Sequence, residues 1–245
     1  MSITIIPIKI KEDVQPGDDL TQLILSSNKS SIDDGDVIII SQKIISKKEG
    51  RVIKIDSVIP SELSIGIASA YDKDPRLVEA ILSESKRIVR MEHGVIIVET
   101  KHNFICANAG IDESNVEKGF ATLLPVDPDR SAKKIRDSIL QITGKNIAVL
   151  ISDTFGRPFR LGQTDHAIGV AGIEAVQSYE GKPDTFDKIM RVTAIAVVDE
   201  LCAASELVMG KTNKIPAVII KNYNFESKNG NISSIIRDEK EDLFR

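Results

Sequence analysis

The stretch SDTFGRPFRLGQTDHAIGVAGI, Ser152 to Ile173, follows the apolar run Ile147–Ile151 directly. A short apolar run that ends in polar residues predicts a buried strand. We expect this strand to end at Ser152, so that Asp153 and Thr154 place an acid and a hydroxyl at its carboxyl end. The fold is best worked out from this strand, because the chemically distinctive residues of the chain follow it.

Two arginines, Arg157 and Arg160, come next, separated by a proline and flanked by Gly156 and Gly162. Carboxylate and hydroxyl oxygens suit a hard cation, guanidinium groups suit carboxylate or phosphate, and glycine allows close approach of the backbone. This combination indicates a site that holds a metal ion beside an anion. We assign Arg157 and Arg160 a clamping role on a carboxylate or phosphate group from their residue type.

Hydrophobic periodicity predicts strands and helices on both sides of this stretch. Strands are expected at Ile3–Lys9, Val37–Ile40, Arg51–Ile55, Arg87–Met91, Gly94–Thr100, Phe104–Ala107, Ile147–Ile151, Val192–Val198 and Ala217–Lys221. Helices are expected at Asp18–Ser27, Ser61–Tyr71, Pro75–Ser85, Ser131–Thr143 (with Asp129 or Arg130 near its cap) and Asp199–Met209. The strands come in groups and do not alternate strictly with helices, which favours an α+β fold with mixed or antiparallel sheets. The tail, residues 222–245, is polar.

The bulk properties exclude several classes of protein. The chain has 245 residues and a net charge of −4, so it lacks the basic excess of a general nucleic-acid binder. Its longest apolar runs are too short to span a bilayer, and its first residues are typical of a strand, not of a signal peptide. Cys106 and Cys202 are expected to be buried, reduced thiols of a cytoplasmic protein and not a disulfide.

A second cluster, CANAGIDESNV, runs from Cys106 to Val116 and follows a predicted strand. Asp112 is a candidate second carboxylate ligand, and Asn115 a candidate donor to a phosphate or base. The alternative is an Asx-turn, in which Asp112 or Asn115 bonds the backbone close by in the chain. The metal interpretation gains weight when both clusters are taken together, because Mg²⁺ sites commonly use one or two carboxylates plus substrate phosphate.

A third cluster, SQKIISKKEGR, runs from Ser41 to Arg51 after a predicted strand. It presents Gln42, Lys43 and Lys47, and a basic turn at the end of a strand suits a polyphosphate. The alternative is a solvated, charged hairpin.

Gly210, Lys211 and Thr212 look like the end of a P-loop. The glycine that this motif requires five positions earlier is Ser205, and the segment follows a helix, so the P-loop interpretation fails.

Together, VIIISQKIISKKEGR, HNFICANAGIDESNV, ISDTFGRPFRLGQTDHAIGVAGI and ELVMGKTNKIPAVII resemble, in this order, the coenzyme F-420-0:L-glutamate ligase family of deazaflavin coenzyme biosynthesis. The resemblance implies a GTP-dependent ligase that activates the carboxylate of coenzyme F-420-0 as an acyl phosphate, joins L-glutamate to it, and releases GDP and phosphate. A second glutamate can follow through a gamma linkage. The resemblance also implies Mg²⁺ or Mn²⁺ as a cofactor and stimulation by K⁺. It further implies a homodimer with an intertwined α+β architecture. Residues 1–245 would form a single ligase domain of two subdomains, with the chain crossing between them.

The resemblance also implies roles for individual residues. Asp112, Asp153 and Thr154 would be metal ligands. The nucleotide site would include Gln42, Lys43, Lys47, Asn115, Met209, Gly210 and Lys211. A protonated lysine cannot ligate a cation, so at Lys211 we expect contact with phosphate. Two other functions stay open: a ligase of the same fold with another carboxylate acceptor, and a non-catalytic nucleotide-binding protein.

Overall fold

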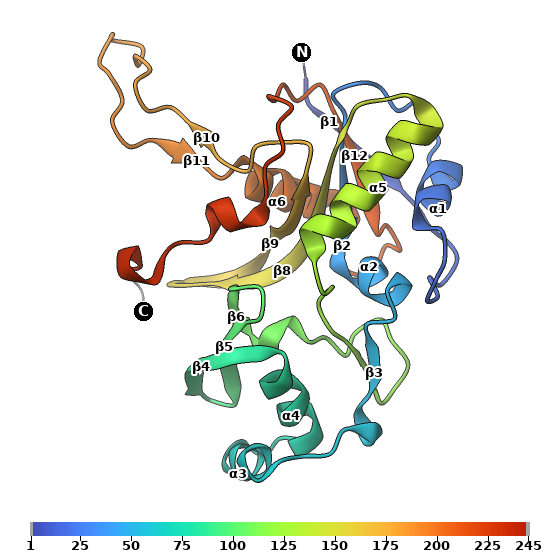
Figure 1. Ribbon diagram of the computed structural model, residues 1–245, viewed down its shortest axis with the longest axis vertical. Helices are drawn as coiled ribbons and strands as arrows, with labels where there is room; N and C mark the ends of the chain where they lie inside the picture. The colour runs from blue at the N-terminus through green and yellow to red at the C-terminus, as the bar shows by residue number, and fades with distance from the viewer. Residues whose placement is uncertain (1, 244–245) are drawn as a thin grey trace.

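The larger part of the computed structural model, which describes residues 2–243, is built on a five-stranded sheet (Figure 1). Its strands, in spatial order, are β1 (Thr4–Ile8), β12 (Ala217–Lys221), β2 (Val37–Ser41), β8 (Ala148–Arg157) and β9 (Arg160–Ala171). Strands β2 and β8 pair in parallel, and the other neighbours pair antiparallel. The carboxyl end of β2 therefore lies beside Ser152, in the middle of β8, and ligands of open sheets are commonly bound at the carboxyl ends of parallel strands.

Helices cover both faces of this sheet. Val37–Ile40 and Ala148–Ile151 are buried at every position, as expected for strands with protein on either side. Helix α5 (Pro128–Thr143) packs against β8 and β9 with α1 (Leu20–Ser27) beside it, and α6 (Val197–Met209) packs on the other face (Figure 1). Together these layers form the main hydrophobic core.

A smaller part, drawn below the main sheet in Figure 1, has its own hydrophobic cluster. It contains the three-stranded sheet β4 (Ser85–Glu92), β5 (Val95–Thr100) and β6 (Ile105–Ala107), and the helices α3 (Glu62–Tyr71) and α4 (Pro75–Ser83). The chain leaves the main sheet through β3 (Val52–Lys54) and returns through β7 (Phe120–Thr122), and these two strands pair. The small part is thus inserted between β2 and β8.

Two segments lie at the periphery. The short pair β10 (Gln177–Ser178) and β11 (Ala194–Ile195) forms the base of an arm that projects from the larger part (Figure 1). The polar tail after β12 is ordered through 3-10 turns at Ile232–Ile235 and Glu239–Glu241. Asp129, at the start of α5, holds the first of these turns by accepting from the backbone N–H of Ile232 at 3.1 Å.

The predicted α+β fold is confirmed, and most predicted elements lie within two residues of the observed ones. The segment from Ser41 to Arg51 was wrongly expected to be a turn or hairpin. Its residues Gln42–Lys48 form helix α2, whose buried residues are Gln42, Ile45 and Ser46. Their spacing of three and four is the helical one, and the charged lysines between them hide it.

Three further predictions of element boundaries were wrong. The predicted strand Val192–Val198 is strand only at Ala194–Ile195, because Val197 and Val198 pack in the first turn of α6. Helix α5 begins at Pro128, and its cap is Asp127, whose side chain accepts from the backbone N–H of Arg130. Strand β8 continues six residues past Ile151, because β9 pairs with it almost to its end.

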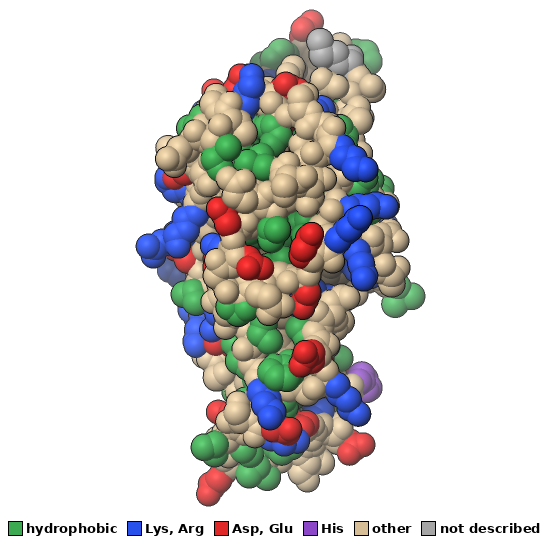
Figure 2. Space-filling view, turned by 90° about the vertical axis from the view of Figure 1, so that its right-hand side faces the viewer, with side chains coloured by type: hydrophobic (Ala, Val, Ile, Leu, Met, Phe, Trp, Pro, Cys, Tyr) green, Lys and Arg blue, Asp and Glu red, His purple; other side chains and the backbone are tan. Residues whose placement is uncertain are grey.

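Charged groups of both signs are interspersed on the face that carries α1 and α2 (Figure 2). Among the described residues, no helix is both long enough and apolar enough to cross a membrane. Cys106 and Cys202 are buried and free, as predicted.

Candidate functional site

The β8–β9 hairpin divides the central motif between two faces. Asp153 lies opposite His166, and Thr154 lies opposite Asp165. Because side chains alternate along a strand, Asp153 and His166 point to one face, and Thr154 and Asp165 to the other. The acid and the hydroxyl that sequence analysis assigned to one metal site therefore start on opposite sides of the sheet.

On the first face, Lys43 joins two of the predicted clusters. Its ammonium group lies 2.8 Å from Oδ2 of Asp112, and it donates to Oγ of Ser114 at 2.6 Å. Lys43 follows β2 and Asp153 lies on β8, where the parallel pair Ser41–Ser152 places the carboxyl end of β2 beside the middle of β8. The basic helix α2, the loop after β6 and strand β8 thus meet at one place.

The pKa values of Asp153 and Asp112 are shifted by the charges around them. The pKa of Asp153 is raised from 3.8 to about 7, mainly by desolvation; the negative charges of Asp165 and Asp112 add to this rise, and a backbone hydrogen bond from Thr154 and the charge of Lys43 oppose it. Burial also raises the pKa of Asp112, but hydrogen bonds from Lys43 and Ser114 outweigh it, so the net shift is downward. A carboxylate that is buried among like charges is short of positive charge, and a bound cation would supply it.

Asp112 also confirms the alternative that sequence analysis left open. Its Oδ1 accepts from the backbone N–H of Ser114 at 2.6 Å, which is an Asx-turn. Its backbone N–H and C=O both bond Thr122 of β7. The turn leaves Oδ2 for Lys43, so the structural role and a role in the site are compatible.

On the second face, Thr154 and Lys211 form a network with Asp165, which is 5% exposed. The hydroxyl of Thr154 donates to Oδ1 of Asp165 at 2.6 Å. The ammonium of Lys211 donates to Thr154 Oγ1 at 2.6 Å and to Asp165 Oδ1 at 3.0 Å. A divalent cation on the hydroxyl of Thr154 would stand beside this ammonium and be repelled by it. Thr154 as a metal ligand stays a prediction.

Sequence analysis missed Asp165 as a member of the site. The available signal was the register of the hairpin: if Ala148–Ala171 is taken as two strands that turn at Pro158 and Phe159, Asp165 falls opposite Thr154. Because the strand was expected to end at Ser152, this pairing was not visible.

Helix α2 separates the other two predicted residues of its cluster. Gln42, which is 1% exposed, donates from Nε2 to Ser46 at 2.6 Å and to the carbonyl of Leu123 at 3.0 Å. Its Oε1 is buried without a partner among the described residues. Lys47 bonds Asp13 in the N-terminal loop at 2.6 Å. Gln42 thus anchors α2, and Lys47 reaches a different segment from Lys43.

The remaining predicted nucleotide residues lie in two turns. Asn115 is exposed, with a φ of 57°, in the loop that carries Asp112. Met209 is buried at the end of α6, and Gly210 follows it with a φ of 56°. With a ψ of −178°, Gly210 has a backbone conformation that is essentially restricted to glycine, so this turn, which aims Lys211 at Asp165, requires glycine.

The two arginines lie at the far end of the hairpin. Arg157 pairs with Arg160 next to the turn, and Arg157 donates to the carbonyl of Leu161 at 2.8 Å. Asp153 is four residues back along β8, a separation of about 13 Å in an extended strand. Within one chain, therefore, the arginines are not brought to the carboxylates.

The Asp153 face of the hairpin packs on the small part of the molecule. Burial, followed by the nearby charge of Asp153, raises the pKa of the Cys106 thiol in β6 to about 12, so this thiol stays protonated. The rings of Phe155 and His166 stack with a centroid separation of 5.7 Å, and the ring of Phe104 lies tilted against Phe155 at 6.2 Å. They line a cavity of about 240 Å³ next to this face.

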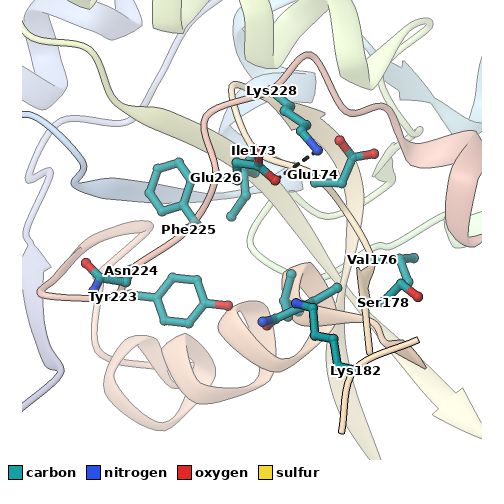
Figure 3. Close-up of a pocket in the computed structure, with 12 residues that line it drawn as sticks. Ile173, Glu174, Val176, Ser178, Lys182, Tyr223, Asn224, Phe225, Glu226 and Lys228 are labelled. Atoms are coloured by element: carbon teal, nitrogen blue, oxygen red, sulfur yellow. Dashed lines mark ion pairs between the residues drawn. The ribbon is translucent and has the colours of Figure 1, made fainter. Parts of the chain in front are cut away.

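A larger cavity of about 640 Å³ lies elsewhere, between the base of the arm and the tail (Figure 3). Tyr223 and Phe225 stack on one side of it, and Lys228 pairs with Glu226 at 2.9 Å. None of the predicted site residues lines it. It begins at Ile173, beyond the end of β9 that is remote from the hairpin turn.

Within residues 2–243, no group of three or more His, Cys, Asp or Glu side chains is arranged to hold a metal ion. Asp112 and Asp153 are carboxylates, which suit a hard cation, and the charge of Asp112 acts on Asp153, but a cation held by both stays a prediction. Mg²⁺ commonly takes one or two protein carboxylates and completes its shell with water and substrate phosphate.

The sequence profile of the F420-0:gamma-glutamyl ligase family matches residues 8–222. The chain belongs to this family. It is 45% identical to the coenzyme F420:L-glutamate ligase of Methanothermobacter thermautotrophicus over 251 aligned residues, covering 100% of both chains. It is 47% identical to the enzyme of that name from Methanocaldococcus jannaschii, over 87% of this chain and 86% of the relative. The corresponding ligase of Methanopyrus kandleri is 39% identical over 100% of this chain and 98% of its own.

Membership of the F420-0:gamma-glutamyl ligase family confirms the predicted resemblance and makes the chain an amide-forming ligase of F420 biosynthesis that acts on small molecules. The family match includes β2, the Asp112 loop, the β8–β9 hairpin and the turn of Lys211. All the residues discussed above as parts of the site therefore lie inside the matched segment.

Proposed function

We propose that the protein uses GTP to join L-glutamate to the carboxylate of coenzyme F-420-0 and can then add a second glutamate through a gamma linkage. The observation that carries this proposal is the ion pair of Lys43 with Asp112, whose charges both act on Asp153 where the carboxyl end of β2 lies beside β8. One ammonium and two carboxylates fit a polyphosphate bound with a divalent cation.

The proposed reaction runs in two steps. The acceptor carboxylate attacks the γ-phosphorus of GTP, which gives an acyl phosphate and GDP. The amine of L-glutamate then attacks the acyl carbon, which releases phosphate and forms the amide. Neither step needs a protein nucleophile, so positioning and compensation of charge are the main demands on the site.

Particular residues meet these demands. Asp112 and Asp153 would hold Mg²⁺ or Mn²⁺, which neutralises charge on the phosphates when bound. Lys43, fixed between Asp112 and Ser114, would face the same phosphates. Asn115 and the turn of Met209 and Gly210 remain proposed contacts of the nucleotide. Stimulation by K⁺ is proposed from the family resemblance alone.

A homodimer is also proposed. Its support is the set of large apolar side chains on the arm and the hairpin turn, where Phe159 is 88% and Leu161 is 98% exposed, and Phe186 and Val192 are similarly open. A dimer could also supply Arg157 and Arg160 to the partner's carboxylates. Size-exclusion chromatography with light scattering tests this, and a monomer at micromolar concentration contradicts it.

The test of the reaction is a mass spectrum of the product. Purified protein with coenzyme F-420-0, L-glutamate, GTP and Mn²⁺ should give products heavier by one and two glutamyl groups. ATP in place of GTP, and other carboxylates in place of the acceptor, separate this function from its alternatives. The absence of any glutamyl product with competent substrates would refute the proposal, and nucleotide binding without GDP release would indicate a binding protein.

A further inference from the structure

Asp165 is the most thoroughly bonded buried acid near the proposed phosphate site, and neither the proposed mechanism nor the family resemblance uses it. It lies in the middle of β9, and its oxygens accept from three different side chains. The hydroxyl of Thr154 donates at 2.6 Å, the ammonium of Lys211 at 3.0 Å, and the hydroxyl of Ser152, in a weaker bond, at 3.4 Å. A buried carboxylate commonly needs such partners, so burial alone does not make it functional.

The geometry of Lys211 goes beyond what burial requires. Its side chain is 54% exposed, yet its ammonium is fixed by Thr154 and Asp165, with Glu206 at 3.5 Å. An ion pair of an exposed ammonium contributes little to stability, because solvent screens it. An ammonium has three donors; two make hydrogen bonds here, and the third has only the longer ion pair with Glu206, so it can turn to an anion from solvent.

The position of the network connects it to the site. Thr154 follows Asp153 in β8 and bonds it through the backbone, and the charge of Asp165 acts on Asp153. Lys211 reaches the network from the turn after α6, which the glycine at position 210 permits. A fixed ammonium thus stands beside Thr154, the neighbour of Asp153 in the chain, on the face of β8 opposite the Asp153 side chain.

We propose that Asp165 is a positioning residue, which holds the ammonium of Lys211 and the hydroxyl of Thr154 in place so that Lys211 binds a phosphate group of the substrate nucleotide. Asp165 does not touch the phosphate itself. Asp165 directs the ammonium of Lys211 toward the phosphate, and it accepts the hydrogen bond that fixes the hydroxyl of Thr154. This inference rests on the proposed function for the identity of the nucleotide, but the binding of a polyphosphate can be tested without it.

The test uses inorganic triphosphate with Mg²⁺, measured by isothermal titration calorimetry on the full chain. Lys211→Met should weaken binding roughly tenfold, as expected for loss of one charge-assisted hydrogen bond. Lys29→Met removes an exposed lysine before β2, at the other end of the sheet, and should bind as the parent does. Equal binding by Lys211→Met and the parent would overturn the proposal.

A double-mutant cycle tests whether Asp165 acts through Lys211. Asp165→Asn should also weaken triphosphate binding several-fold, and the double variant with Lys211→Met should be no weaker than Lys211→Met alone. Additive losses would show that Asp165 acts independently of Lys211 and would overturn the positioning role. Thermal unfolding shows whether Asp165→Asn is folded. If it is not, Asp165→Glu, which keeps the charge, takes its place in the cycle with the same expectation.

The outcome is separable from that of the proposed function. Triphosphate binding that depends on Lys211 and Asp165, with no glutamyl product, leaves the phosphate network standing and refutes the reaction. If glutamyl product forms but Lys211→Met binds triphosphate as the parent does, the proposed function stands and the phosphate network is refuted.

Discussion

Replacing Asp153 by Asn should make the metal-free protein more stable at alkaline pH, although it removes a residue of the proposed site. The asparagine has nearly the same shape, and its Oδ1 can keep the hydrogen bond from the backbone of Thr154. What it removes is a carboxylate that is desolvated and lies near two other acids. Functional sites commonly retain such destabilising groups.

The magnitude follows from the pKa of Asp153, which is about 7 in the folded chain against an ordinary value of 3.8. Each pKa unit corresponds to about 1.36 kcal/mol, which gives an upper limit of about 4 kcal/mol at pH 8. Part of the side chain is exposed to water, so we expect about half of this limit, roughly 2 kcal/mol. For a chain of this size, that raises the melting temperature by about 4–8 °C.

The sign depends on pH in a defined way. Because its pKa is higher in the folded state, Asp153 favours folding at low pH, and this contribution is lost as the pH rises through about 7. Wild type and Asp153→Asn should therefore be equally stable near pH 4, and the variant should be the more stable one at pH 8.

The assay is urea or thermal unfolding in EDTA at pH 5 and pH 8. Glu180→Gln, which removes an exposed carboxylate from the arm, is the matched control and should show no such difference between the two pH values. Adding Mn²⁺ should stabilise the wild type and leave Asp153→Asn unchanged. A variant that is no more stable than the wild type at pH 8 would refute the reasoning that Asp153 is held at an electrostatic cost.

Three further predictions follow from the same geometry. Asp112→Asn should lower turnover more than tenfold with the fold intact, because the phosphates lose charge compensation; near-normal rates in a steady-state assay of GDP release would remove Asp112 from the site. Gly169→Ala should destabilise the fold by about 1–3 kcal/mol in urea unfolding, because its Cβ would lie 2.5 Å from the carbonyl oxygen of Pro128 at the start of α5; unchanged stability would contradict this packing. Chelation of divalent cations should abolish glutamyl transfer, and Mn²⁺ should restore it; activity that persists in excess EDTA argues against a cation in the site.

Much of the fold was predictable because its strands are short and apolar and its helices begin with clear caps. The strand of residues 217–221 and the helix that starts at Pro75 are examples, since one is a bare apolar run and the other opens on Asp and Pro. Helix α2 was not predictable from periodicity alone, because a buried glutamine and a buried serine occupy positions where apolar residues are expected. Their partner, the carbonyl of Leu123, lies about 80 residues further along the chain.

The candidate site shows the same limit. Asp112 and Asp153 were found as separate acids, and Lys43 as part of a basic cluster, but nothing local indicated that Lys43 would pair with Asp112. The network of Asp165 depends on the pairing of two strands, and sequence analysis ended the first strand too early. Side chains brought together by long-range pairing are identified from sequence only when the register is known.

The central claim is that one divalent cation is held between Asp112 and Asp153, against the phosphates of GTP. Anomalous X-ray diffraction from crystals grown with Mn²⁺ and a non-hydrolysable GTP analogue tests it most directly. The account predicts one strong peak in contact with oxygens of both carboxylates and of the nucleotide. A manganese peak that touches neither carboxylate, or a nucleotide bound away from the carboxyl end of β2, would contradict it.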